Sequence, residues 1–176
     1  MSVAKVIQRH QFADYLNCGT TEEPNYQLMG TGFTSLDESP NAQTNTKKYV
    51  NEKSSTTSIT QYQTEFPYNA DLIKSELAIL TLYEIGRNHK TGSDAVLEYC
   101  RVELWDPAET DSKSKFKARK FFVANSVDDI SGDDDIQVSG TLNAMGDPID
   151  GVFDIEKGTF TASGTTTEAE SGTSGT

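Results

Sequence analysis

The most constraining feature of the sequence is a strand-like segment with no apolar face, residues 56–66 (TTSITQYQTEF). Its Thr and aromatic content favours a β-strand, and helix signals are absent. Alternate side chains of a strand point to opposite faces, which puts Ser58, Thr60, Tyr62, Thr64 and Phe66 on one side and Thr57, Ile59, Gln61, Gln63 and Glu65 on the other. Because neither face is apolar, burial alone does not specify the register of this strand. The segment therefore predicts a sheet with a wetted face and a partner.

The apolar content of the chain is low for a domain that folds alone. Leu, Ile, Val and Phe together make 36 of 176 residues, and the net charge is −12. This composition lies near the edge at which acidic chains stay unfolded, although seven Tyr, eight Phe and one Trp favour a globular domain. The length suits one domain. We expect a folded domain with a small core that gains stability from neighbouring copies.

The acidic charge is concentrated in the last third of the chain. Residues 1–127 carry 16 acidic and 14 basic residues, whereas residues 128–176 carry 11 acidic residues against Lys157 alone. Such a segment repels phosphate and would not bind nucleic acid by releasing counterions. The composition is compatible with simple solubility and also with a surface that stays close to DNA without binding it.

Several classes of protein are disfavoured. No apolar run approaches the roughly 20 residues of a membrane span, and the first residues lack the apolar core of a secretory signal. Cys18 and Cys100 belong to no CxxC pair, which favours a reduced compartment over a disulfide framework.

No catalytic or metal-binding constellation is evident. His10 and His89 are the only histidines and fit no ligand pair. Residues 86–92 (GRNHKTG) lack the ending of a phosphate-binding loop, and residues 128–135 do not follow the spacing of an EF-hand. The sequence therefore predicts neither enzyme activity nor a cofactor or metal site.

The remaining pattern predicts about seven short strands and one helix, a mostly β (α+β) fold. The helix is expected at residues 71–85, with Asn69 or Asp71 as its N-cap and an end at Gly86 and Arg87. Its apolar stripe comprises Leu72, Ile73, Leu77, Leu80 and Tyr83. Strands are expected at residues 27–36 with a bend at the glycines, and at 56–66, 95–105, 116–127, 136–142 and 151–161; residues 37–46 are expected as a loop and 47–53 as one arm of a hairpin.

Residues 113–120 (KSKFKARK) form the one basic cluster, with Lys113, Lys115, Lys117 and Arg119 on one strand face. A solvated face is the first interpretation. The second is pairing of Lys115, Lys117 and Arg119 with an acidic turn on a neighbouring copy, at Asp133, Asp134 and Asp135. Nucleic-acid binding ranks third, because Phe116 lies on the opposite face and cannot stack with bases there.

The order of several short segments resembles the major tail (tail tube) proteins of long-tailed phages of Gram-positive bacteria. These segments are GTGFTSL at residue 30, PNAQT at 40, KYVN at 48, ITQY at 59, FP at 66, NADLI at 69, YEIGR at 83 and LNAMGDP at 142. The resemblance covers roughly residues 1–162. It implies a β-sandwich-like or barrel-like tail-tube domain over 1–162 with one flanking helix, similar in fold to the ring subunit of type VI secretion.

The resemblance also implies a structural role in the virion. Six copies would form a ring whose inner strands join into one barrel, and rings would stack into a tube through which genomic DNA passes without tight binding. The expected partners are further copies, the tape measure and tail terminator proteins, and no membrane; assembly would take place in the host cytoplasm. Residues 163–176 (SGTTTEAESGTSGT) would be a flexible Gly/Ser/Thr-rich tail, without the immunoglobulin-like decoration that follows such a linker in some members.

Two sets of residues follow as candidates from this resemblance. The lumen would be lined by Gln61, Gln63, Glu65, Gln137, Ser139, Thr141, Asp154 and Glu156. A long loop at residues 37–53 would reach the adjacent ring, with Pro40, Asn41, Gln43, Lys47, Lys48 and Tyr49 as contact candidates.

A monomeric β-sandwich module that binds a ligand such as carbohydrate is the alternative. It needs an exposed aromatic cluster, for which Tyr99 and Trp105 on one strand face are the candidates. An enzyme ranks third.

Overall fold

The computed structural model describes residues 4–110 and 112–164. The predicted tail at 163–176 lies outside the described residues from position 165 onward. The elements, in chain order, are η1 (Arg9–Gln11), β1 (Phe12–Asn17), β2 (Tyr26–Leu28), β3 (Phe33–Leu36), β4 (Ala42–Lys47), β5 (Thr56–Tyr62), β6 (Glu65–Asp71), α1 (Leu77–Arg87), η2 (Gly92–Ala95), β7 (Val96–Pro107), β8 (Lys115–Ser131), β9 (Gln137–Ala144), β10 (Ile149–Asp154) and β11 (Thr159–Ala162).

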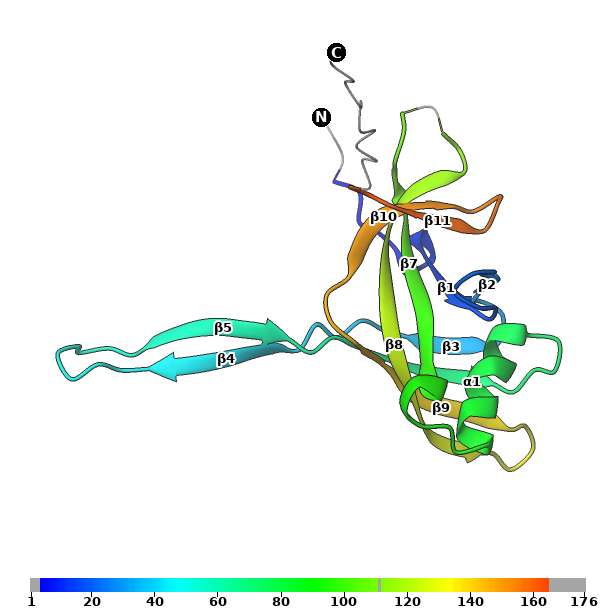
Figure 1. Ribbon diagram of the computed structural model, residues 1–176, viewed down its shortest axis with the longest axis horizontal. Coiled ribbons are helices and arrows are strands. Elements are labelled where there is room, and N and C mark those ends of the chain that lie inside the picture. The colour runs from blue at the N-terminus through cyan, green and yellow to red at the C-terminus, as the bar shows by residue number, and fades with distance from the viewer. Residues whose placement is uncertain (1–3, 111, 165–176) are drawn as a thin grey trace, which may run out of the picture.

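The predicted mostly β fold is confirmed. Nine strands form one curled sheet in the order β2-β1-β7-β8-β9-β6-β3, with β10 and β11 attached to β8. The long strand β8 runs through the middle of this sheet, and α1 lies beside its lower half (Figure 1). The remaining two strands, β4 and β5, form a separate sheet.

The core fills the inside of the curled sheet. Its largest fully buried side chains include Tyr99, Phe66 and Phe121, whose rings pack against one another with centroids 4.7 to 6.1 Å apart. A second, smaller cluster lies on the other face of β7 around Cys100, Val102 and Phe153. Strand β7 is therefore buried on both faces over much of its length, which explains why its sequence does not alternate cleanly.

The helix is shorter than predicted, and its buried face is different. Residues 65–71 pair with β9 as a strand, so the predicted start at Asp71 is wrong and the helix begins at Leu77. Leu77 is exposed, and the buried stripe consists of Ala78, Ile79, Leu82 and Ile85. The predicted end is confirmed at Arg87. A Cβ on Gly86 would lie 2.7 Å from Cβ of Val127, so glycine permits the close packing of the helix on β8.

Three strand predictions need correction. Residues 27–36 contain two strands, because the chain turns between them through Gly32 at φ +86. Residues 37–46, predicted as a loop, contain most of β4, which pairs with β5; the predicted hairpin arm at 47–53 instead forms most of the connection between them. Residues 56–66 likewise divide into β5 and the start of β6.

Candidate functional site

Strands β4 and β5 form an arm, residues 42–62, that projects from the body of the molecule (Figure 1). Every residue of β5 is exposed, and the two strands pair only with each other among the described residues. Side chains add local bonds between the strands: the hydroxyls of Thr46 and Thr57 lie 3.0 Å apart, and Thr60 Oγ1 donates to the Gln43 carbonyl at 3.0 Å. The arm is thus held together by its own pairing and not by packing on the body.

The arm exposes apolar side chains that nothing in its own chain covers. Tyr49, Val50, Ile59 and Tyr62 are between 60 and 109% or, for Ile59, 58% exposed. A two-stranded ribbon alone is marginally stable in water, and its unpaired edges can pair with other strands. These features indicate a segment that is completed by contact with another molecule.

A carboxylate anchors the root of the arm to the sheet. Glu38, just before the arm, accepts two hydrogen bonds from the Arg119 guanidinium, each 2.8 Å long, and lies 3.6 Å from Arg101 Nε. Ser39 pairs with Glu65 of β6, and the Gln63 amide donates to the Asn41 carbonyl at 3.1 Å. The direction in which the arm leaves the body is therefore fixed by charge and by backbone pairing.

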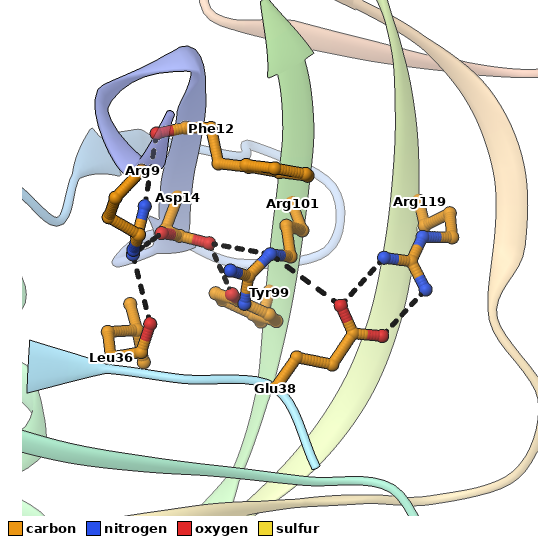
Figure 2. A network of polar contacts seen from close by, with 8 residues as sticks. All are labelled: Arg9, Phe12, Asp14, Leu36, Glu38, Tyr99, Arg101 and Arg119. Carbon is orange, nitrogen blue, oxygen red and sulfur yellow. Dashed lines mark hydrogen bonds and ion pairs between the residues drawn. The ribbon is translucent and has the colours of Figure 1, made fainter. Parts of the chain in front are cut away.

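The anchor is part of a buried ionic network, shown in Figure 2. Asp14 accepts hydrogen bonds from Arg9, at 2.7 Å, and from the Tyr99 hydroxyl, and it lies 3.8 Å from Arg101 Nε. The pairing registers of β1, β7 and β8 place Asp14, Arg101 and Arg119 in one row across the sheet. Arg9 also donates to the Leu36 carbonyl at 3.0 Å, which ties the start of the chain to β3.

Ionisation of Glu38 stabilises the folded chain. Burial raises the pKa of Glu38, but the hydrogen bonds and charge of Arg119, with the charge of Arg101, outweigh burial and leave this pKa below its ordinary value. A carboxylate with a lower pKa in the folded state contributes stability above its unfolded pKa, about 4.3 for Glu, and loses it as the pH falls through the folded pKa.

We expect Glu38→Gln to lower the free energy of unfolding by about 1–3 kcal/mol at pH 7, the usual range for hydrogen bonds to charged groups. The difference from the unmodified chain should shrink below about pH 4, where the carboxylate becomes protonated. Urea denaturation followed by circular dichroism at pH 7 and pH 3 measures both values. Glu109→Gln is the control, because Glu109 is 63% exposed and pairs only with Lys115; its effect should stay below about 1 kcal/mol. An equal loss for Glu38→Gln at both pH values would contradict the ionic anchor.

A second surface, the polar face, lies on the outer side of β6 and β9. Residues directly opposite in paired strands share a face, and the register aligns Glu65, Pro67, Asn69 and Asp71 with Asn143, Thr141, Ser139 and Gln137. Gln137 donates to Asp71 at 3.0 Å across this face. The opposite face of the same strands carries the buried Phe66, Tyr68, Val138 and Leu142. The sheet thus has an apolar inner face and a polar outer one.

The structure brings together four of the eight lumen candidates, namely Glu65, Gln137, Ser139 and Thr141. Gln61 lies on the arm and Gln63 at its root, so the alternation predicted through residues 56–66 does not extend across the break between β5 and β6. Asp154 is buried, and its carboxylate accepts from the amides of Glu156 and Lys157 at 3.0 and 3.2 Å. Asp154 and Glu156 belong to the β10–β11 turn and do not lie on the polar face.

The basic candidates are partnered within the chain. Lys115 lies 3.3 Å from Glu109, Lys117 lies 2.8 Å from Asp106, and Arg119 holds Glu38. The predicted role of Arg119 as a free charge for a neighbouring copy is therefore wrong, because its guanidinium anchors the arm. Asp133, Asp134 and Asp135 are exposed in the β8–β9 turn.

The candidates for inter-ring contact all fall on the arm or at its root: Pro40, Asn41, Gln43, Lys47, Lys48 and Tyr49. What the sequence did not reveal is the pairing of β4 and the ionic anchor. Glu38 and Arg119 are 81 positions apart, and no local pattern marks either residue.

Residues 4–110 and 112–164 contain no helix with the length and apolar content needed to cross a bilayer. The same part of the chain holds no group of three or more His, Cys, Asp or Glu side chains arranged to bind a metal ion.

No family model matches the chain. No curated protein matches it either. Among solved structures, the chain is similar to one in the cryo-EM structure of the anti-feeding prophage (AFP) baseplate, 6-fold symmetrised, with a TM-score of 0.47 and 9% sequence identity, covering 89% of this chain and 99% of that chain. A likeness this distant assigns neither a family nor a function.

The aromatic cluster required by the ligand-binding alternative does not form. Tyr99 is completely buried, with its hydroxyl bound to Asp14, whereas Trp105 is partly exposed and packs edge-on against Phe12. The two rings therefore offer no common platform for a sugar.

Proposed function

We propose that this chain is a structural virion protein that assembles into stacked hexameric rings, forming a phage tail tube that delivers DNA. Residues 1–162 would be the tail-tube domain. The observation that carries the proposal is a sheet that is polar on one face and open at both ends. Strand β3 pairs only with β6 among the described residues, and beyond Ala124 the edge of β8 away from β9 pairs with no described strand.

Open edges explain why copies would associate. An exposed strand edge pairs readily with another chain, and closing a sheet into a barrel removes such edges. The β3 edge of one copy and the β8 edge of the next are different surfaces, so their contact is head-to-tail, and such contacts form a ring when the rotation closes. The polar face would then line the bore, because the apolar face is already buried by each copy's own core.

The chemistry of the polar face suits the passage of DNA. It carries amides, hydroxyls and the carboxylates of Glu65 and Asp71, and no basic side chain among the residues that define it. A surface without Lys or Arg neutralises no phosphate and releases no counterions, so DNA is not retained. The arm would connect successive rings, and the tape measure and tail terminator proteins would contact the inside and the end of the tube.

Electron microscopy of concentrated purified protein tests the assembly. We expect rings or tubes with a continuous central channel. Particles that remain single copies at every concentration, also after seeding with assembled material, would contradict the proposal.

Lysine substitution tests the assignment of the bore. We expect Ser139→Lys with Thr141→Lys to leave tube assembly intact and to slow DNA ejection by about tenfold or more, because each ring would then attract phosphates. The control is Thr159→Lys on β11, an exposed position outside the polar face, which should eject DNA at the normal rate. Normal ejection by the double variant, in tubes of normal appearance, would show that the polar face does not line the bore.

A further inference from the structure

A groove of about 700 Å³ lies where the curled sheet fails to close, between β1 and β3. We call it the seam groove, and its apolar lining is formed by Phe12, Ala13, Leu28, Met29, Phe33 and Leu36. Its charged lining residues, Arg9 and Asp14, are bound to each other at 2.7 Å. The seam groove therefore offers an apolar floor without a free charge at that pair.

Strand edges border the seam groove on both sides. On one side is β3, whose single strand partner among the described residues is β6. On the other side are residues 12–14 of β1, which precede the stretch of β1 that pairs with β2. A slot with an apolar floor and unpaired strand edges is suited to an extended segment, which gains backbone hydrogen bonds from the edge and buries alternate side chains in the floor.

Exposed apolar side chains gather at the seam groove and on the arm. Leu28 lines the groove and is exposed, and Trp105, which is also exposed, packs on the Phe12 ring at its border. The arm exposes Tyr49, Val50, Ile59 and Tyr62. Uncovered apolar surface of this kind marks an interaction site, and each surface has what the other lacks.

We infer that the seam groove of one copy binds the arm of a second copy, with β5 as the inserted strand; this rests on the proposed self-assembly. Strand β5 is extended, has an unpaired edge and contains no charged residue, so its insertion desolvates no charge. The arm cannot serve its own groove, because the root anchored at Glu38 directs it away from the body (Figure 1). Each copy donates one arm and accepts one, a head-to-tail contact that continues from copy to copy.

Crosslinking of a double-cysteine variant tests this contact. Leu28→Cys in the groove and Ile59→Cys on β5 are combined in the full chain with Cys18→Ala, while the buried Cys100 is left in place. After treatment of the assembled protein with a short bismaleimide, we expect a ladder of covalent multimers on a denaturing gel. Each single-cysteine variant should stop at the dimer, because it has one reactive position per chain.

The matched control joins Ile59→Cys with Gln137→Cys on the polar face, a position equally open to reagent. It should give no ladder beyond dimers. Assembled rings or tubes without a Leu28–Ile59 ladder, or with a ladder of equal strength from the control, would overturn the arm-in-groove contact and leave the proposed function standing. Complete absence of assembly and of crosslinking would overturn both.

Discussion

Replacing Asp14 with alanine is expected to lower the free energy of unfolding by about 3–5 kcal/mol, the usual cost of removing one partner from a buried ionic group. Asp14 is 2% exposed and is the common acceptor for Arg9 and Tyr99. Its removal leaves Arg101 buried with Glu38, 3.6 Å away, as its remaining ionic partner. Because Nε and Nη1 of Arg101 already lack a hydrogen bond, no other group compensates for the loss.

The Tyr99 hydroxyl adds to this cost. Burial and the neighbouring Asp14 carboxylate raise the pKa of Tyr99 well above its ordinary value, so the hydroxyl stays protonated and must donate. In Asp14→Ala it is buried without an acceptor at that position. Asp14→Asn keeps an acceptor oxygen but loses the charge, and we expect a smaller loss than with alanine.

Urea denaturation at pH 7, followed by circular dichroism, measures these changes. The control is Asp129→Ala, because Asp129 is exposed and accepts a hydrogen bond from the neighbouring Ser131; we expect a change within about 0.5 kcal/mol. A loss of less than about 1 kcal/mol for Asp14→Ala would mean that the network contributes little to folding.

Local patterns in the sequence predicted the strands at 95–105, 116–127 and 136–142, which correspond to β7, β8 and β9. In β9 the alternation is clean because one face is core and the other solvated. The helix start was wrong because Leu72 and Ile73 extend the apolar spacing upstream of Leu77, while the pairing of residues 65–71 with β9 competes for that stretch. Helical periodicity carries no information about a strand partner about 70 positions away.

The same limit applies to the candidate site. Gln137, Ser139 and Thr141 could be placed on one face from their own alternation, and the structure confirms that they share it. The buried network could not be found this way, since Asp14, Glu38 and Arg119 meet only through the curl of the sheet. Charged residues are usually solvated, so the sequence alone favoured a solvated basic stripe where the structure has an anchor.

Removing the arm is expected to abolish assembly while leaving the fold of the body intact. The chain offers a natural place for the cut, because the Gln63 amide donates to the Asn41 carbonyl at 3.1 Å and the two ends of the arm are already adjacent. Asn41 has a left-handed backbone, at φ +48, which suits a tight turn. Replacing residues 42–62 with a two-residue Asn-Gly turn should therefore close the gap without strain.

The body should lose little stability, because β4 and β5 contribute no residue to either core cluster and no strand to the nine-stranded sheet. We expect the free energy of unfolding to change by less than about 1 kcal/mol. Assembly should fail because, in our proposal, the arm is what one copy inserts into the seam groove of the next.

Point substitutions separate loss of the arm from loss of its apolar contacts. Ile59→Asp with Tyr62→Asp keeps the arm but puts charge on two exposed apolar positions, and burying an unpaired carboxylate in an apolar groove costs several kcal/mol. We expect this variant to fold normally and to assemble at least tenfold less readily by electron microscopy and light scattering. Thr57→Asp, at the exposed start of β5, is the matched control and should retain more assembly. If the armless chain still forms tubes of normal length, the arm does not connect copies, and ring stacking must depend on the body alone.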